Sequence, residues 1–253
     1  MVDFDFQNES ISLDSRILFF LNYQPIVSIQ KELLPGFLQA IKDSFTQPEE
    51  VKSFIWQMMQ KSGEAPQQES STVSQWRFTD KDKLVGAVIG PEALIVEAPK
   101  LQSFSPFRTF VEILIGAFTK AYQDVKFTKI ALRVIHTVII KTGNALTWDG
   151  YISPSFRTAI PNSESETNGL ARVIVQRVYK KENCLAIFNF GLPNPEFPNV
   201  ITRRQFVLDV ECNTKDVSPD VVKQVDEFRN LVRELLISST ENLLKDHVGA
   251  WYA

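Results

Sequence analysis

Cysteine, histidine and glycine are scarce in this sequence of 253 residues. The two cysteines, Cys184 and Cys212, and the two histidines, His136 and His247, do not have the spacing of a zinc site. The ten glycines are scattered, and none belongs to a glycine-rich loop of the kind that holds nucleotide phosphates. We therefore expect no metal, no cofactor and two buried, free thiols.

Long hydrophobic runs are also missing. No apolar run approaches the roughly 20 residues that a membrane-spanning helix needs. The segment Met1–Phe6 is acidic and lacks the basic start and apolar stretch of a secretory signal. Both observations favour a cytoplasmic protein without membrane contact. Hydrophobic residues make up 44% of the chain, which is ordinary for a globular protein with a sizeable core.

The spacing of apolar residues divides the chain into strands and helices. Helices are predicted over residues 32–45, 48–61, 105–122 and 219–238, with a short final helix to about His247. Strands are predicted over residues 16–29, 76–79, 84–89, 93–97, 127–140, 170–179, 184–190 and 205–212. The polar, turn-rich segment 62–74 predicts a mobile linker between them.

This order of elements indicates an α+β fold. Runs of strands beside single helices favour one or more antiparallel sheets with long helices packed on one face. Two similar units of three strands and a helix, from a distant duplication, would also fit. The corresponding domains are an N-terminal segment of strand and helix at 1–61, the linker at 62–74, and an α+β core at 75–253. A single domain that includes residues 1–61 is the alternative.

Charge is distributed unevenly along the chain. Residues 120–204 carry 12 basic and 6 acidic side chains, whereas residues 1–100 and 205–253 are acidic. This pattern fits a basic binding face, and it fits equally well a match of charges inside one domain. If the basic middle is a surface, six cations are the candidate binding residues: Lys129, Arg133, Arg172, Arg177, Arg203 and Arg204.

His136 is the strongest candidate for a catalytic residue in the sequence. Strand alternation puts it on the apolar face of residues 127–140, opposite Arg133 and Lys129. We expect that face to pack on the helix 105–122, which would bury the imidazole. No serine, cysteine or carboxylate is placed locally to work with it as a general base. We therefore assign no catalytic residue.

Three short segments carry a family resemblance. Residues 76–78 read Trp-Arg-Phe, residues 103–107 read Ser-Phe-Ser-Pro-Phe, and residues 129–136 read Lys-Ile-Ala-Leu-Arg-Val-Ile-His. Together they resemble a sporadically distributed bacterial family of uncharacterised proteins, in which the third segment is similar to R-I-G-L-R-Y-I-N. Val134 and His136 stand where that family has tyrosine and asparagine. The resemblance implies a bacterial source and a place in an antiviral defence system, but no reaction.

These observations favour a non-enzymatic binding or regulatory protein that acts through another protein. The resemblance adds the expectation that it is an accessory component of a bacterial antiviral defence system. A nucleic-acid-binding module that uses the basic region 120–204 is the first alternative. An enzyme of an unrecognised kind is the second. Salt-dependent binding of oligonucleotides would separate the first two readings.

Overall fold

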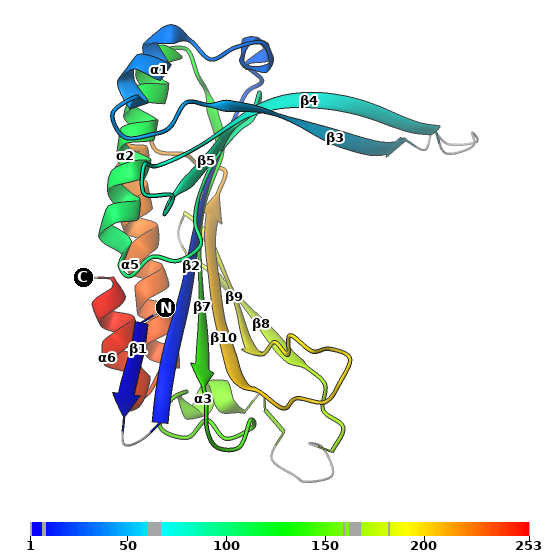
Figure 1. Cartoon of the computed structure of the whole chain (residues 1–253), viewed down its shortest axis with the longest axis vertical. Coiled ribbons are helices and arrows are strands. Elements are labelled where there is room, and N and C mark those ends of the chain that lie inside the picture. The colour runs from blue at the N-terminus through cyan, green and yellow to red at the C-terminus, as the bar shows by residue number, and fades with distance from the viewer. Residues whose placement is uncertain are drawn as a thin grey trace.

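The computed structural model describes residues 2–6, 9–59, 67–158, 160–161, 168–181 and 183–252. This part of the chain forms one antiparallel sheet of ten strands (Figure 1). The strands are β1 (Val2–Phe6), β2 (Glu9–Tyr23), β3 (Glu49–Met59), β4 (Gln67–Thr79), β5 (Gly86–Ile89), β6 (Ala93–Ala98), β7 (Phe127–Ile140), β8 (Val173–Lys180), β9 (Leu185–Leu192) and β10 (Arg204–Thr214). The helices are η1 (Val27–Gln30), α1 (Pro35–Ile41), α2 (Phe104–Ala121), α3 (Pro154–Arg157), α5 (Val221–Ser239) and α6 (Asn242–Trp251).

Two long strands, β2 and β7, form the centre of the sheet. The strand order is β3-β4-β5-β6-β2-β7-β10-β9-β8, and β1 pairs with β2 beside this path. The pairing of β2 with β7 extends from Ile11 opposite Ile140 to Tyr23 opposite Phe127. The segment that carries the family resemblance, residues 129–136, is therefore in the middle of the sheet.

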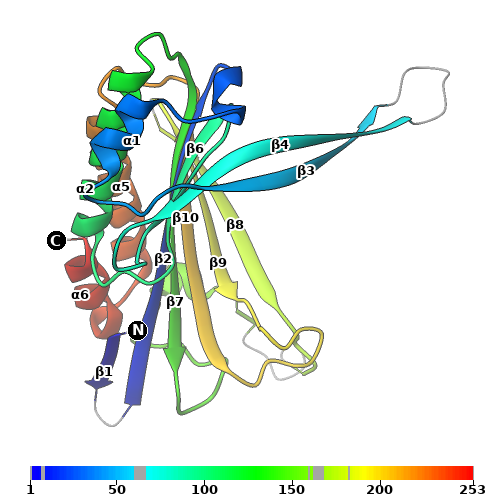
Figure 2. The same cartoon turned by 45° about the horizontal axis from the view of Figure 1, so that its top comes forward.

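The helices α2, α5 and α6 lie along one face of the sheet, as two views agree (Figures 1 and 2). α5 packs on β7 and β10 and contacts both α2 and α6. Along β7 the side chains alternate: Val134 and His136 are buried toward the helices, whereas Arg133 and Ile135 are half-buried on the other side. The core therefore lies between the sheet and these helices. We call the opposite side, which includes Arg133 and Ile135, the uncovered face.

Amphipathic patterns explain why the two longest helices form where they do. In α2 the buried residues Phe107, Val111, Leu114 and Phe118 are spaced by four, three and four, which places them on one side of a helix. α5 begins at an N-cap, Asp220, whose carboxylate accepts a hydrogen bond from a backbone N–H in the first turn. None of the helices in the described part of the chain is both long and apolar enough to cross a membrane.

The expected fold class is wrong. We predicted long helices on one or more antiparallel sheets, with the option of two similar units of three strands and a helix. The structure has one continuous antiparallel sheet, with 38% of residues in strands and 29% in helices, and its described residues form only four helices of seven or more residues. One source of the error is the predicted helix over 48–61, because Glu49–Met59 is the strand β3. Its pairing with β4 is a non-local contact that apolar spacing does not reveal.

The β3–β4 hairpin extends beyond the rest of the sheet. β3 pairs with β4 from Glu49 opposite Arg77 to Met59 opposite Gln67, whereas only Trp76–Thr79 of β4 also pairs with β5. The hairpin therefore forms an arm, which projects on the side away from the helices (Figures 1 and 2). Of the predicted linker 62–74, residues 62–66 lie outside the described residues, and residues 67–74 belong to β4. The division into domains at this segment stays a prediction.

Candidate functional site

Arg133, one of the predicted binding residues, is held by an ion pair on the uncovered face. Its Nε donates to Asp209 Oδ1 at 2.8 Å and its terminal nitrogen donates to Oδ2 at 2.7 Å. These hydrogen bonds raise the pKa of the guanidinium further above its ordinary value. Asn189 extends the network by donating to Asp209 at 3.5 Å, and Gln176 donates to Asn189 at 2.9 Å. The network crosses four strands, and within it the positive charge of Arg133 is neutralised by the carboxylate of Asp209.

Arg172 and Arg177 are also engaged, each by a backbone oxygen and an aromatic ring. Arg172 Nε donates to a carbonyl at 2.9 Å, and its guanidinium carbon lies 4.5 Å from the ring centroid of Phe197. Arg177 donates to the carbonyl of Ser155 at 2.8 Å and lies 4.5 Å from the centroid of Phe156. Cations placed over aromatic faces stabilise the fold. Reversing these two charges would therefore disturb local structure as well as the surface potential.

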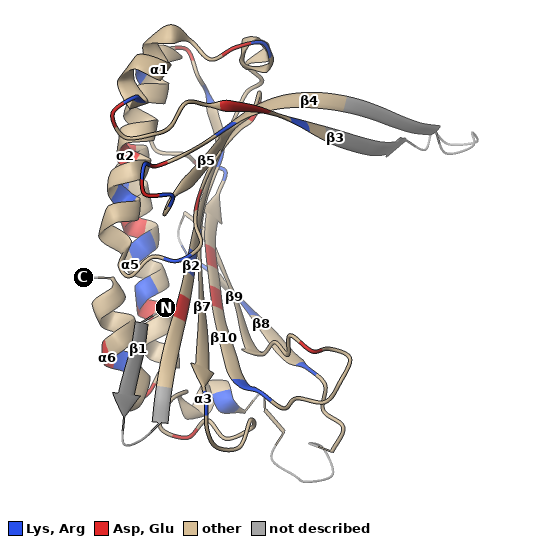
Figure 3. Cartoon of the chain, in the orientation of Figure 1, with Lys and Arg blue, Asp and Glu red and all other residues tan. Residues whose placement is uncertain are grey.

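The remaining predicted cations are spread over the sheet and its loops. Arg204 is buried, and it donates to the carbonyls of residues 142 and 147 at 3.2 and 2.9 Å. Arg203 pairs with Glu196 at 2.7 Å in an exposed position. Lys129 is half-buried on the uncovered face of β7. Basic and acidic segments are interspersed over the described elements (Figure 3).

His136 is fully buried, which confirms the prediction from strand alternation. Its Nδ1 is hydrogen-bonded to the hydroxyl of Ser15 at 2.7 Å, and its Nε2 lies 3.4 Å from the hydroxyl of Tyr252. The Trp251 ring meets the imidazole edge to face, with centroids 5.0 Å apart. Burial lowers the pKa of His136 to about 3, so the ring is neutral at physiological pH. These aromatic neighbours belong to the end of α6 and not to the helix 105–122 that we expected.

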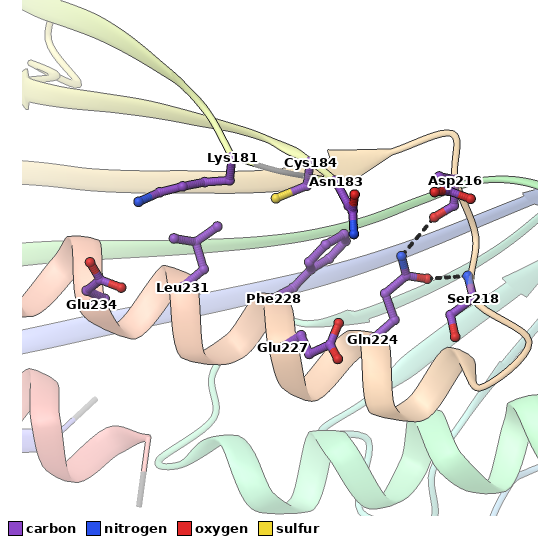
Figure 4. Close-up of a pocket in the computed structure, with 10 residues that line it drawn as sticks. All are labelled: Lys181, Asn183, Cys184, Asp216, Ser218, Gln224, Glu227, Phe228, Leu231 and Glu234. Atoms are coloured by element: carbon purple, nitrogen blue, oxygen red, sulfur yellow. Dashed lines mark hydrogen bonds between the residues drawn. The ribbon is translucent and has the colours of Figure 1, made fainter.

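A groove with a volume of about 560 Å³ lies between α5 and the β8–β9 turn (Figure 4). Phe228 and Leu231 of α5 form its apolar part, with Glu227 and Glu234 beside them on the same helix. Cys184 lies on the opposite wall. Burial raises the pKa of this thiol above its ordinary value, which disfavours the thiolate that a nucleophile needs.

The chemistry of the groove suits binding better than catalysis. Gln224 is committed to the adjoining loop, because its amide donates to the carbonyl of Asp216 and accepts from the N–H of Ser218, both at 2.9 Å. No histidine lines the groove. Among the described residues, no three His, Cys, Asp or Glu side chains gather in a way that could hold a metal ion. We therefore find no nucleophile with a base beside it here.

The uncovered face carries apolar side chains among its charged ones. Its half-buried apolar side chains come from five adjacent strands and include Leu18, Phe20, Ile95, Ile135, Ile187 and Val207. Charges among them are compensated locally, by Arg133 with Asp209 and by Arg16 with Glu97 at 2.5 Å. In the register of the sheet Phe20 lies directly opposite Ile95, whereas Ile135 lies between Arg16 of β2 and Asp209 of β10. Apolar side chains gathered on an uncovered sheet face make it a candidate interaction site.

Our prediction from sequence missed these residues because it searched for chemistry-bearing side chains. A signal for them was present. The run Ile17–Leu21 reads Ile-Leu-Phe-Phe-Leu and is apolar at every position, whereas a strand with one wet face alternates. The run Val138–Ile140 has the same property. Continuous apolar runs in an antiparallel sheet predict that both faces of the strand avoid water.

Compared with known protein families and with curated proteins, the chain matches no family model and no curated sequence. The resemblance noted for residues 76–78, 103–107 and 129–136 therefore stays an expectation.

Proposed function

We propose that this chain is a non-enzymatic binding protein that acts through protein–protein interaction, and that the uncovered face of its sheet holds the partner. The observation that carries this proposal is the spread of half-buried apolar side chains over β6, β2, β7, β10 and β9, on the side that none of the described α-helices covers. Burying apolar surface is the main driving force of protein association.

The charges on this face favour a protein partner over a nucleic acid. Phosphate binding needs free cations, because affinity comes largely from neutralising phosphates. In the middle of this face Arg133 and Arg16 are already paired with carboxylates at 2.7 and 2.5 Å. A largely apolar partner surface with few charges can dock without breaking these pairs. We therefore rank the nucleic-acid-binding module below the protein-binding reading.

An enzymatic reading has less support than either. The histidine that strand alternation singled out, His136, is fully buried and hydrogen-bonded within the core. The thiol in the groove beside α5 has a raised pKa. The place of the protein in a bacterial antiviral defence system, as an accessory component, rests on the family resemblance of residues 129–136, and its cytoplasmic location rests on composition.

Two substitutions test the proposal. Ile135→Glu places a charge in the middle of the uncovered face, and Val27→Glu places the same charge at a 66% exposed valine in η1. Tagged versions of both are purified from the native host beside the wild type. We expect one defined protein to accompany the wild type and Val27→Glu but not Ile135→Glu, and to bind again when purified components are mixed. Salt-sensitive oligonucleotide binding without such a protein would contradict the proposal.

A further inference from the structure

The strand β8 is an edge of the sheet with little protection against further pairing. In the described part of the chain it pairs with β9 alone, from Val173 opposite Leu192 to Lys180 opposite Leu185, with no break in register. Natural edge strands are usually blunted by proline, lysine or a bulge. β8 reads Val-Ile-Val-Gln-Arg-Val-Tyr-Lys, so it contains no proline, and its one lysine, Lys180, is its last residue.

Apolar side chains stand exposed along this edge. Ile174 and Val178 are 45% and 56% exposed, and Leu185 on the neighbouring strand is 42% exposed. They continue the uncovered face, because Val178 lies opposite Ile187 and Gln176 lies opposite Asn189 in the register of β8 with β9. An added strand would therefore gain both backbone hydrogen bonds and side-chain contacts.

The positive charge along the β8 edge indicates which kind of strand could be added there. Between residues 168 and 181 the chain has two arginines and two lysines and no acidic residue. Lys180 is exposed at the end of β8, and Arg172 is exposed just before its start. A second copy of the chain that paired its own β8 here would bring these cations against each other, which is unfavourable. An acidic segment would meet opposite charge.

We infer that β8 is extended by one strand of a partner protein, an extended segment in which apolar and acidic residues alternate. The inference rests on the proposed protein-binding function, and it specifies the partner class and the way in which it docks. Backbone pairing fixes the added strand in the plane of the sheet. Its apolar residues lie beside Ile174 and Val178 on the uncovered face, and its carboxylates, which strand alternation turns to the other face, lie near Arg177.

The first test uses a defined probe, a fluorescein-labelled peptide of eight residues, the length of β8, that alternates valine with glutamate. A twin with lysine in place of glutamate is the matched control. We expect the acidic peptide to bind with at least about tenfold lower Kd than its twin, and less tightly as salt rises. It should also slow amide exchange in β8. Equal affinity of the two peptides would overturn the inference.

Substitutions then locate the binding. Val178→Asp should weaken the acidic peptide about tenfold or more, because it removes an apolar contact and adds a repelling charge. Ile174→Asp is a second variant of the same kind. Val27→Asp, at a valine of similar exposure in η1, should bind like the wild type. Thermal melts confirm that each variant is folded.

Two results separate this inference from the proposed function. Ile135→Glu should leave peptide binding within about twofold of the wild type, because it lies four strands along the sheet order from any added strand. If Val178→Asp does not change peptide binding, the inference that β8 is the docking site is refuted, whereas the proposal for the uncovered face is unaffected. A dimer in sedimentation analysis that Val178→Asp dissociates would show that a second copy covers the edge, and would also refute the inference.

Discussion

The buried imidazole of His136 should make the unfolding free energy of the protein fall as the pH falls. The substitution His136→Gln should remove this part of the pH dependence. In the folded chain burial lowers the pKa of His136 from its ordinary value of 6.5 to about 3. The unfolded chain therefore binds one more proton than the folded chain between these two values. Stability from this group is fully present above pH 6.5 and is lost as pH falls toward 3.

The size of the effect follows from the two pKa values. Each pH unit inside the window costs about 1.4 kcal/mol of unfolding free energy, so a change from pH 7 to pH 5 costs about 2 kcal/mol. His136→Gln cannot take up the proton, and its unfolding free energy should lose about 2 kcal/mol less over the same interval. At pH 7 the variant should be less stable by about 1–3 kcal/mol, because Ser15 and Tyr252 lose a partner.

Urea unfolding at pH 7 and pH 5 measures both quantities. His247→Gln is the matched control, because the only other histidine is less buried and should leave most of the pH dependence in place. All three proteins have the same carboxylates, so the difference between profiles isolates the histidine. Parallel profiles for the wild type and His136→Gln would refute the argument that a neutral, desolvated imidazole is held in the core.

Three further outcomes follow from individual contacts. Asp209→Asn should lower the unfolding free energy by about 1–2 kcal/mol, because it leaves the half-buried guanidinium of Arg133 without its carboxylate. Glu97→Gln, in an exposed pair, should change the unfolding free energy by less than about 1 kcal/mol. Equal losses for the two variants in chemical denaturation would contradict this. Arg177→Glu should lower the melting temperature, since it replaces a cation over two aromatic rings with an anion, and an unchanged temperature would show that these contacts are not stabilising. Cys212 should resist a thiol reagent in the folded protein while Cys184 reacts slowly, and both should react after denaturation; fast labelling of Cys212 in native buffer would contradict its burial.

Local pattern predicted most of the strands but not how they assemble. The alternation in residues 127–140 placed His136 and Arg133 on opposite faces, as the structure confirms. The same reasoning failed for residues 48–61, because their pairing with β4 is set by a partner beyond the reach of local spacing. Apolar periodicity is a property of one segment, whereas strand order depends on contacts between segments that are far apart in sequence.

The candidate site was harder to predict than the fold for a related reason. Charge counting drew attention to cations such as Arg133, whose partner Asp209 lies on a different strand 76 residues away. Sequence alone does not show that this charge is already neutralised. The apolar members of the uncovered face were visible in the run Ile17–Leu21, but only the position of the helices shows which of them lack a covering element.

Site-specific photo-crosslinking in the native host tests the central claim most directly. A benzophenone side chain replaces Ile135 on the uncovered face or, as the control, the exposed Arg233 on α5. We expect the first position to crosslink to one defined protein and the second to yield no crosslink to it. Crosslinks to nucleic acid from position 135, or protein crosslinks from position 233 alone, would contradict the assignment of this face as a protein-binding surface.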